Sequence, residues 1–442
     1  MLQGMREIPS SALRRSLRLA GLPTAYAGRA ALGLGKCQGG RPAELVAAEM
    51  QARTAAQLFQ TLGELKGGAM KLGQALSAME AAMPAQMAGP YRDALERLQE
   101  AAPPMPADVV HQVLTEELGA DWRQRFQSFD DRPAAAASIG QVHRARWYDG
   151  TEVAVKVQYP GAADALLADV RHLDRLAPLA RFGAPSVDLA ALFAEVRERL
   201  AEELNYEREA ETQRDFVAGF AADDDYVVPR VVEATPQVLV SEWVDGMPLS
   251  AVIRQASKDV RDRAGLLLLR LLLSAPERAG CIHGDPHPGN FRVDAHGRLV
   301  VLDFGSSEPM ADGWPSRLRR LLRAAADGDA TALHTEMVAA ALIAPDAIDP
   351  DPLLRIADPW IEPLRRERFH FRRSWLQNEV RRWSDPRSPG SRLQRKVRIP
   401  PEHMLVQRVA FGLLGVLTSL DATVPVRAEI DRSIPGSTSP PP

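Results

Sequence analysis

Cysteine and long apolar runs are scarce in this chain. Its 442 residues include only Cys37 and Cys281, too few for a disulfide framework or a zinc site made of cysteines. The most apolar runs are 266–273, which Arg270 interrupts, and 409–420, which is shorter than the ~20 residues that span a bilayer. No signal peptide is apparent either. We therefore expect a cytoplasmic protein without a transmembrane helix.

A strong excess of charge is also missing. The formal net charge is -3, which argues against a nucleic-acid partner bound through bulk charge. Two local exceptions are basic: no acidic residue lies between Glu7 and Glu44, and residues 365–398 hold twelve Lys/Arg against three carboxylates. Both are candidate contacts with an anionic membrane surface, at its inner face. The alternative is an ordinary solvated basic surface.

One short stretch carries most of the chemistry. Residues 283–290 read His-Gly-Asp-Pro-His-Pro-Gly-Asn, and an Asp-Phe-Gly triplet starts at Asp303. Asp285 and Asn290 are five positions apart, as are the catalytic Asp and metal-binding Asn of a kinase catalytic loop. Two short predicted strands between residues 291 and 302 flank a turn-forming Asp-Ala-His-Gly segment. We expect this hairpin to fold Asp303 back beside Asn290.

These residue types suit phosphoryl transfer. Mg²⁺ takes oxygen ligands, so the carboxylate of Asp303 and the amide oxygen of Asn290 are candidate metal ligands. Asp285 is the candidate to orient or deprotonate an acceptor hydroxyl or water. The expected cofactors are therefore ATP/ADP and Mg²⁺.

A candidate phosphate-binding lysine lies upstream. The predicted strand 153–158 places its valines on one face and Lys156 on the other. Its Val-Ala-Val-Lys sequence matches the kinase strand whose lysine holds the α and β phosphates. Such a lysine needs a glutamate partner on a following helix, which is predicted over 186–220. Spacing alone does not choose among its candidates, Glu202, Glu203, Glu207 and Glu209.

Two further segments are candidate nucleotide contacts. Residues 133–145 are similar to the first two strands and loop of a kinase small lobe, with alanines in place of glycines. Alanine cannot adopt the glycine conformations that drape a loop over triphosphate. Residues 241–246 indicate the hinge that would receive adenine. The candidate contacts are Ala135, Ala136, Ala137, Ser138 and Glu242.

The predicted fold class is α+β: a bilobal protein-kinase-like fold with a small mixed β-sheet N-lobe, a mainly helical C-lobe and an N-terminal helical extension. Helices are expected over 315–343 and 350–383. No Ala-Pro-Glu follows Asp303, so we expect no peptide-docking platform. The expected boundaries are a basic tail at 1–40, the extension at 41–130, the N-lobe at 131–245, the C-lobe at 246–430 and a disordered tail at 431–442.

Six ordered motifs between about residues 40 and 425 resemble the UbiB family of atypical protein-kinase-like proteins, which are linked to ubiquinone and other isoprenoid-lipid pathways. They are Lys71-Leu72-Gly73-Gln74, the Ala-rich segment, Val-Ala-Val-Lys, Glu203-Leu204-Asn205-Tyr206 with Glu209, the His-Gly-Asp loop and Asp-Phe-Gly.

The resemblance implies roles for these positions. Lys156 would pair with Glu209. Lys71, Gly73 and Gln74 match a Lys-x-Gly-Gln helix that lies over the active site in this family, and Glu203 matches the first position of a Glu-x-Asp motif that meets it. The chain departs from the family where the aspartate of that motif is Asn205.

Membership would favour a Mg-dependent ATPase that supports quinone or isoprenoid-lipid biosynthesis, with a lipid or quinone precursor and biosynthetic-complex proteins as partners. Two alternatives remain open. One is a small-molecule phosphotransferase or protein kinase that transfers the γ-phosphate to an acceptor hydroxyl. The other is a nucleotide-gated scaffold without catalysis.

Overall fold

The computed structural model describes residues 104–137, 139–161, 205–385 and 387–434. Residues 105–158 and 205–434 belong to one compact unit. Its first elements are α5 (Ala107–Leu118), η1 (Trp122–Arg125), β1 (Phe126–Phe129), β2 (Ala135–Ala137), β3 (Gly140–Trp147), β4 (Glu152–Gln158), α8 (Tyr206–Phe220), β5 (Tyr226–Val227), β6 (Val231–Ala234), β7 (Val238–Glu242), β8 (Met247–Pro248), α9 (Leu249–Gln255) and α10 (Lys258–Ala279).

The chain continues through short strands into a helical region. The elements are β9 (Cys281–Ile282), η2 (Pro288–Asn290), β10 (Phe291–Val293), β11 (Leu299–Val301), β12 (Glu308–Pro309), α11 (Ser316–Asp327), α12 (Ala330–Ala339), α13 (Pro350–Arg365), β13 (Phe369–His370), α14 (Arg373–Ser384), α15 (Pro389–Gln394), α16 (Pro401–Ser419), β14 (Thr423–Val424) and α17 (Val426–Ser433). None of the helices among these residues is both long and apolar enough to cross a bilayer.

The N-lobe is a six-stranded sheet in the order β1-β3-β4-β7-β6, with β2 paired to β3. Every pair in it is antiparallel, so the expectation of a mixed sheet is corrected. The predicted alternation along β4 is confirmed: Val153, Val155 and Val157 are all fully buried. Lys156 therefore projects from the opposite face, opposite Val142 on β3.

Single residues set the bounds of two segments in the N-lobe. The apolar stretch 226–234 is divided by Pro229, which lacks the N–H that a continuous ladder needs. Its first part, β5, pairs in parallel with β11, and its second part, β6, pairs with β7. The helix expected over 186–220 is not continuous either, because Asn205 is extended (φ -117, ψ 102) and its side chain accepts a hydrogen bond from Glu207 N. Asn205 is therefore the N-cap of α8.

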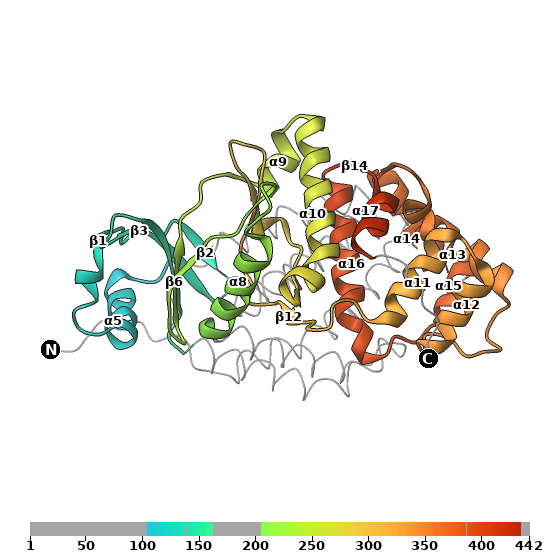
Figure 1. The fold of residues 1–442 in the computed structure, drawn as a ribbon, viewed down its shortest axis with the longest axis horizontal. Helices are drawn as coiled ribbons and strands as arrows, with labels where there is room; N and C mark the ends of the chain where they lie inside the picture. Colours follow the sequence, from blue (N-terminus) through green and yellow to red (C-terminus); the bar gives the residue numbers. More distant parts are fainter. Residues whose placement is uncertain (1–103, 138, 162–204, 386, 435–442) are drawn as a thin grey trace, which may run out of the picture. The chain divides into compact units, whose positions relative to one another are not determined.

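Helix α10 is the centre of the C-lobe core. Its leucines from Leu267 to Leu272 are buried, and it contacts α8, α16 and α17 (Figure 1). At Gly265 a side chain would come within 2.8 Å of Ala422 Cβ, so the glycine permits a close approach of the segment before β14.

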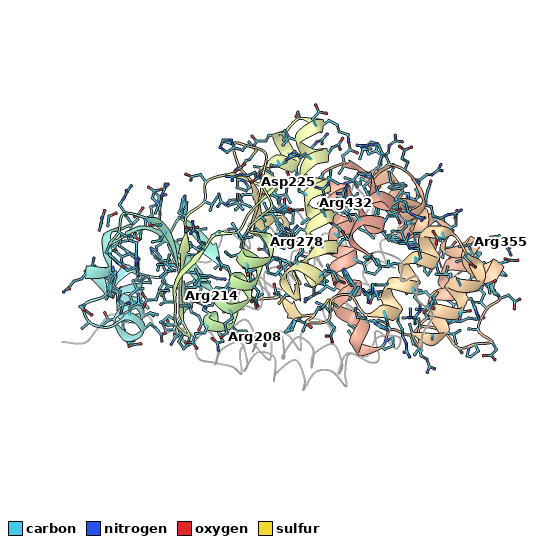
Figure 2. All side chains as sticks on the ribbon, in the orientation of Figure 1. Arg208, Arg214, Asp225, Arg278, Arg355 and Arg432 are labelled. Carbon is cyan, nitrogen blue, oxygen red and sulfur yellow. The ribbon has the colours of Figure 1, made fainter. Side chains whose placement is uncertain are left out.

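Ion pairs join α10 to its neighbours; Figure 2 labels three of the residues that form them, Asp225, Arg278 and Arg432. Asp225 accepts from Arg263 at 2.8 Å and from Arg270 at 3.1 Å, and Arg278 Nη1 lies 2.7 Å from Asp223. The buried carboxylate of Glu429 on α17 binds Arg270 and Arg432, each at 3.0 Å. Because Glu429 is only 1% exposed, removal of Arg270 would leave a buried charge with poorer compensation.

The C-terminal helices are shorter than predicted. Gly328, at φ +68, ends α11 and separates it from α12. The expected 350–383 helix is interrupted by β13, which pairs with β14. Helix α17 extends to Ser433, so residues 431–433 continue the C-lobe rather than begin a tail.

Candidate nucleotide and metal site

The hairpin after the catalytic loop forms as predicted. Strands β10 and β11 are antiparallel with Phe291 opposite Val301. Asp294 stabilises the turn by accepting from the backbone N–H groups of His296 and Arg298, each at 2.9 Å. At the other end Leu302 N donates to Asn290 O at 2.8 Å. Asp303 therefore follows directly from a residue that is hydrogen-bonded to Asn290.

Asn290 also holds Asp285. Its Nδ2 donates to Asp285 Oδ2 at 3.0 Å and to the Asp285 carbonyl oxygen at 3.1 Å. Asn290 is buried and Asp285 is half-buried. The amide nitrogen thus orients the carboxylate, and the amide oxygen remains as the atom that could bind a metal.

Asp303 adopts a backbone conformation that is uncommon for a residue with a side chain. Its φ is +57, in the left-handed region, where Asp is tolerated better than most residues. Gly305 N donates to its Oδ1 at 3.3 Å, and the same oxygen lies 3.8 Å from Lys156 Nζ. The turn therefore aims the carboxylate back toward the N-lobe lysine.

Lys156 contacts one glutamate in particular. Its Nζ lies 2.8 Å from both carboxylate oxygens of Glu209 on α8, whereas Glu207 on the same helix is exposed. A Cβ atom at Gly305 would lie 3.4 Å from Glu209 Oε2, so the carboxylate lies next to the glycine of the triplet. Three segments distant in the sequence therefore meet at the Lys156 ammonium group.

The electrostatics of this group favour a charged lysine. Burial alone would lower the pKa of Lys156, but the carboxylates of Asp303 and Glu209 outweigh burial and raise that pKa above its ordinary value. Lys156 Nζ also lies 4.9 Å from the ring centroid of Tyr206, the first residue of α8. The sequence placed Tyr206 in a motif but assigned it no role, since nothing local links it to Lys156.

An aromatic cluster packs at the catalytic loop, with its rings tilted or edge-on to one another. Phe304 lies 4.9 Å from Phe216 on α8 and 5.7 Å from His283, measured between ring centroids. His283 Nε2 lies 3.3 Å from Leu302 O, and burial lowers the pKa of His283, which favours the neutral ring. This aromatic cluster connects α8, the catalytic loop and the Asp-Phe-Gly triplet.

The remaining predicted positions are less informative. Ala135 and Ala136 are exposed and Ala137 is buried, all on a short strand beside β3. The side chain of Glu242 binds Arg230, at 3.2 Å from its Nε, and its backbone N–H donates to Arg230 O at 2.9 Å, so neither group is free for a nucleotide. Outside the described residues lie Ser138, Lys71, Gly73, Gln74 and Glu203.

The donor atoms fit Mg²⁺ better than a protein-only metal cage. Asp285, Asn290 and Asp303 offer oxygens, which a hard cation prefers. Within the described ranges no group of three or more His, Cys, Asp or Glu side chains could hold a metal ion. Phosphate oxygens would therefore complete the coordination, as is usual for Mg²⁺ bound with a nucleotide.

Several known proteins are similar to this chain. The model of the ABC1 atypical kinase-like domain matches residues 97–337. The chain is 37% identical over 283 residues to "Atypical kinase COQ8B, mitochondrial" of Rattus norvegicus, covering 62% of this chain and 52% of the relative. It is 30% identical over 270 residues to "Atypical kinase COQ8, mitochondrial" of Saccharomyces cerevisiae, covering 60% and 53%.

A solved structure extends the similarity. Rv3197 of Mycobacterium tuberculosis, determined in complex with erythromycin, has a TM-score of 0.68 and 41% identity, and the match covers 90% of this chain and 100% of that chain. By contrast, the chain spans about half the length of the two curated relatives named above.

Proposed function

Because the chain belongs to the ABC1 atypical kinase-like family, of the UbiB type, we propose that it binds ATP with Mg²⁺ and hydrolyses it. The observation that carries this proposal is the meeting of Lys156, Glu209 and Asp303 beside the Asp285–Asn290 pair. Lys156 Nζ is 2.8 Å from Glu209 and 3.8 Å from Asp303. This is the set of groups that phosphoryl transfer by a kinase-like site requires.

Each residue has a distinct task in this proposal. Lys156 binds the α and β phosphates, and Glu209 holds its ammonium group in place. Asn290 and Asp303 would hold Mg²⁺, which supplies neutralisation of the phosphate charge when bound. Asp285, oriented by Asn290 Nδ2 at 3.0 Å, aligns the attacking water and receives its proton.

Two features support water rather than a protein as the acceptor. The Ala-rich segment forms strand β2, paired with β3 from Ala135 to Ala137, instead of a glycine loop over the phosphates. The segment after Gly305 is short: it passes through β12, which pairs with β9, and reaches α11 at Ser316. Kinases that dock peptides use a longer activation segment at this place.

The cellular role proposed here is support of quinone or isoprenoid-lipid biosynthesis. It rests on the family resemblance, since no described residue recognises a quinone. Partners would be a lipid or quinone precursor and proteins of a biosynthetic complex, at the inner face of a membrane. The basic 365–398 segment supports a peripheral contact less strongly than its sequence suggested, because Phe369, Phe371 and Trp375 pack on one another.

The proposal extends to positions outside the described residues. Lys71, Gly73, Gln74 and Glu203 are proposed as regulatory, with the Lys-x-Gly-Gln motif restricting which acceptors reach the phosphate. The extension at 41–130, the N-lobe at 131–245 and the C-lobe from 246 are likewise proposed as the functional units.

The test follows the γ-phosphate of labelled ATP with Mg²⁺, with and without anionic liposomes. The variants are Asp303→Asn and the exposed control Asp312→Asn. Free phosphate that is lost only in Asp303→Asn supports the ATPase, and stimulation by liposomes supports the lipid link. Label on the protein or on an added metabolite would instead show a kinase or phosphotransferase. Nucleotide binding without turnover in the wild type would show a scaffold.

A further inference from the structure

The Lys156 ammonium group lies between two carboxylates. Both carboxylate oxygens of Glu209 on α8 lie 2.8 Å from Nζ, and Asp303 Oδ1 of the Asp-Phe-Gly triplet lies 3.8 Å from it. Asp303 is also a candidate magnesium ligand, so an ammonium group that moved toward this carboxylate would compete with the metal. The position of Nζ between the two carboxylates therefore matters for metal binding.

The ring of Tyr206 is a third group at this ammonium. Its centroid lies 4.9 Å from Lys156 Nζ, within the distance of about 6 Å over which an aromatic ring attracts a cation. Tyr206 is the first residue of α8 and Glu209 follows three residues later, so both side chains lie on one face of the helix. The ring and Glu209 therefore attract the ammonium group toward α8, whereas Asp303 attracts it toward the triplet.

Tyr206 is fixed in place by contacts of its own. It is 1% exposed, and its backbone N–H donates to Pro236 O at 3.1 Å. A Cβ atom added at Gly140, at the start of β3, would lie 3.0 Å from the Tyr206 hydroxyl oxygen. The hydroxyl end of the side chain therefore lies beside β3, and the ring lies below the ammonium group. Because both ends are packed, the ring has little freedom to move away from the lysine.

We propose that Tyr206 is a positioning residue: its ring keeps the Lys156 ammonium group close to α8 and so leaves Asp303 available to Mg²⁺. This inference rests on the proposed nucleotide and metal site and deepens it. Without the ring, the buried ammonium group would lose an attraction on the α8 side, and the carboxylate 3.8 Å away would draw it over. Lys156 and Mg²⁺ would then compete for Asp303, so the site would need a higher Mg²⁺ concentration.

The experiment measures binding of mant-ADP, a fluorescent ADP analogue, to the full chain as the Mg²⁺ concentration is raised. Tyr206→Leu removes the aromatic face and keeps an apolar side chain, so the Mg²⁺ concentration for half-maximal binding should rise about 5-fold or more. Tyr206→Phe keeps the ring and should stay within about twofold of the wild type. The matched control is Tyr148→Leu, because Tyr148 is 65% exposed in the turn between β3 and β4; its Mg²⁺ requirement should not change.

A second background separates positioning from a purely structural role. In Lys156→Met no ammonium group can take Asp303 from the metal, so the addition of Tyr206→Leu should shift the Mg²⁺ requirement by less than about twofold. A structural role would instead give the same shift with and without the lysine, and that result would reject the inference.

Other outcomes would also overturn it. An unchanged Mg²⁺ requirement in Tyr206→Leu would reject the inference, and so would an equal rise in Tyr206→Phe or in Tyr148→Leu. If Tyr206→Leu does not fold, Tyr206→Met fills the space with a flexible side chain that has no aromatic face, and it decides the question by the same measurement. Failure of the wild type to bind mant-ADP, or binding that does not depend on Mg²⁺, would reject the proposed nucleotide and metal site itself. Either result is distinct from failure of the Tyr206 assignment.

Discussion

Replacement of Glu209 by glutamine tests the charge arrangement around Lys156 most directly. The carboxylate side chain is 4% exposed and the lysine 16%, so the pair is largely shielded from solvent. Breaking a buried pair typically costs about 3–5 kcal/mol. Here Asp303 lies only 3.8 Å from Lys156 Nζ, and it can take over as the partner. A new ion pair between Lys156 and Asp303 should recover about 1.5–3 kcal/mol of the lost stability.

The expected result therefore has two parts. The free energy of unfolding should fall by only about 1–3 kcal/mol, measured from the urea midpoint. The magnesium concentration for half-maximal ATP turnover should rise by about 10-fold or more, because Asp303 is then engaged by the ammonium group. Both effects have one structural cause: in the variant, the carboxylate of Asp303 would be shared between Lys156 and the metal.

A mutant cycle separates the two causes. Asp303→Asn combined with Glu209→Gln leaves Lys156 without either carboxylate, so the double variant should lose more stability than the two single losses added together. Glu211→Gln, exposed and on the same helix, is the matched control. An unchanged magnesium requirement in Glu209→Gln, or an equal effect in Glu211→Gln, would refute the reasoning.

Three further predictions concern stability, each measured by urea unfolding. Asn205→Ala should cost about 1 kcal/mol through loss of the α8 N-cap, while Asn205→Asp should cost nothing; equal losses would contradict the cap. Burial lowers the pKa of His143 and of His283 in the folded state, so on acidification the unfolded state takes up protons at a higher pH than the folded state does. The free energy of unfolding should therefore fall as the pH decreases through 6.5, by at most about 1.4 kcal/mol per pH unit for each histidine. A stability that stays constant from pH 7.5 to 5.5 would reject this. Gly140→Ala would place Cβ 2.2 Å from Val157 O, so it should cost at least about 2 kcal/mol, and an unchanged midpoint would count against the strand packing.

The spacing of residues along the chain was enough to predict the geometry of the catalytic loop and of the hairpin that follows it. The five-residue interval from Asp285 to Asn290 and the turn residues before Arg298 predict a hairpin, and the hairpin returns the chain to Asn290 with Leu302 N bonded to Asn290 O at 2.8 Å. Period-two alternation likewise predicted the buried valines of β4 and the opposite face of Lys156. These features depend on backbone geometry over fewer than about 20 residues, and periodicity and spacing over that range can be recognised in a single sequence.

Element boundaries were harder to predict where one residue changed the backbone. Asn205 begins α8 because its side chain caps Glu207 N, although the flanking glutamates continued a helical pattern. Pro229 and Gly328 end elements that periodicity alone would extend. In each case a local hydrogen bond or φ preference overrode the hydrophobic pattern.

Tertiary structure alone decided which groups meet. Spacing left four glutamates as candidates, although the family resemblance implied Glu209. The packing of α8 on the sheet brings Glu209 to Lys156 across 53 positions. The same packing brings the Tyr206 ring to 4.9 Å from Lys156 Nζ, and no pattern near either residue shows it. Spacing along the chain carries information over one or two elements. Contacts between distant elements depend on how their buried faces fit together, and that fit is a property of the folded whole.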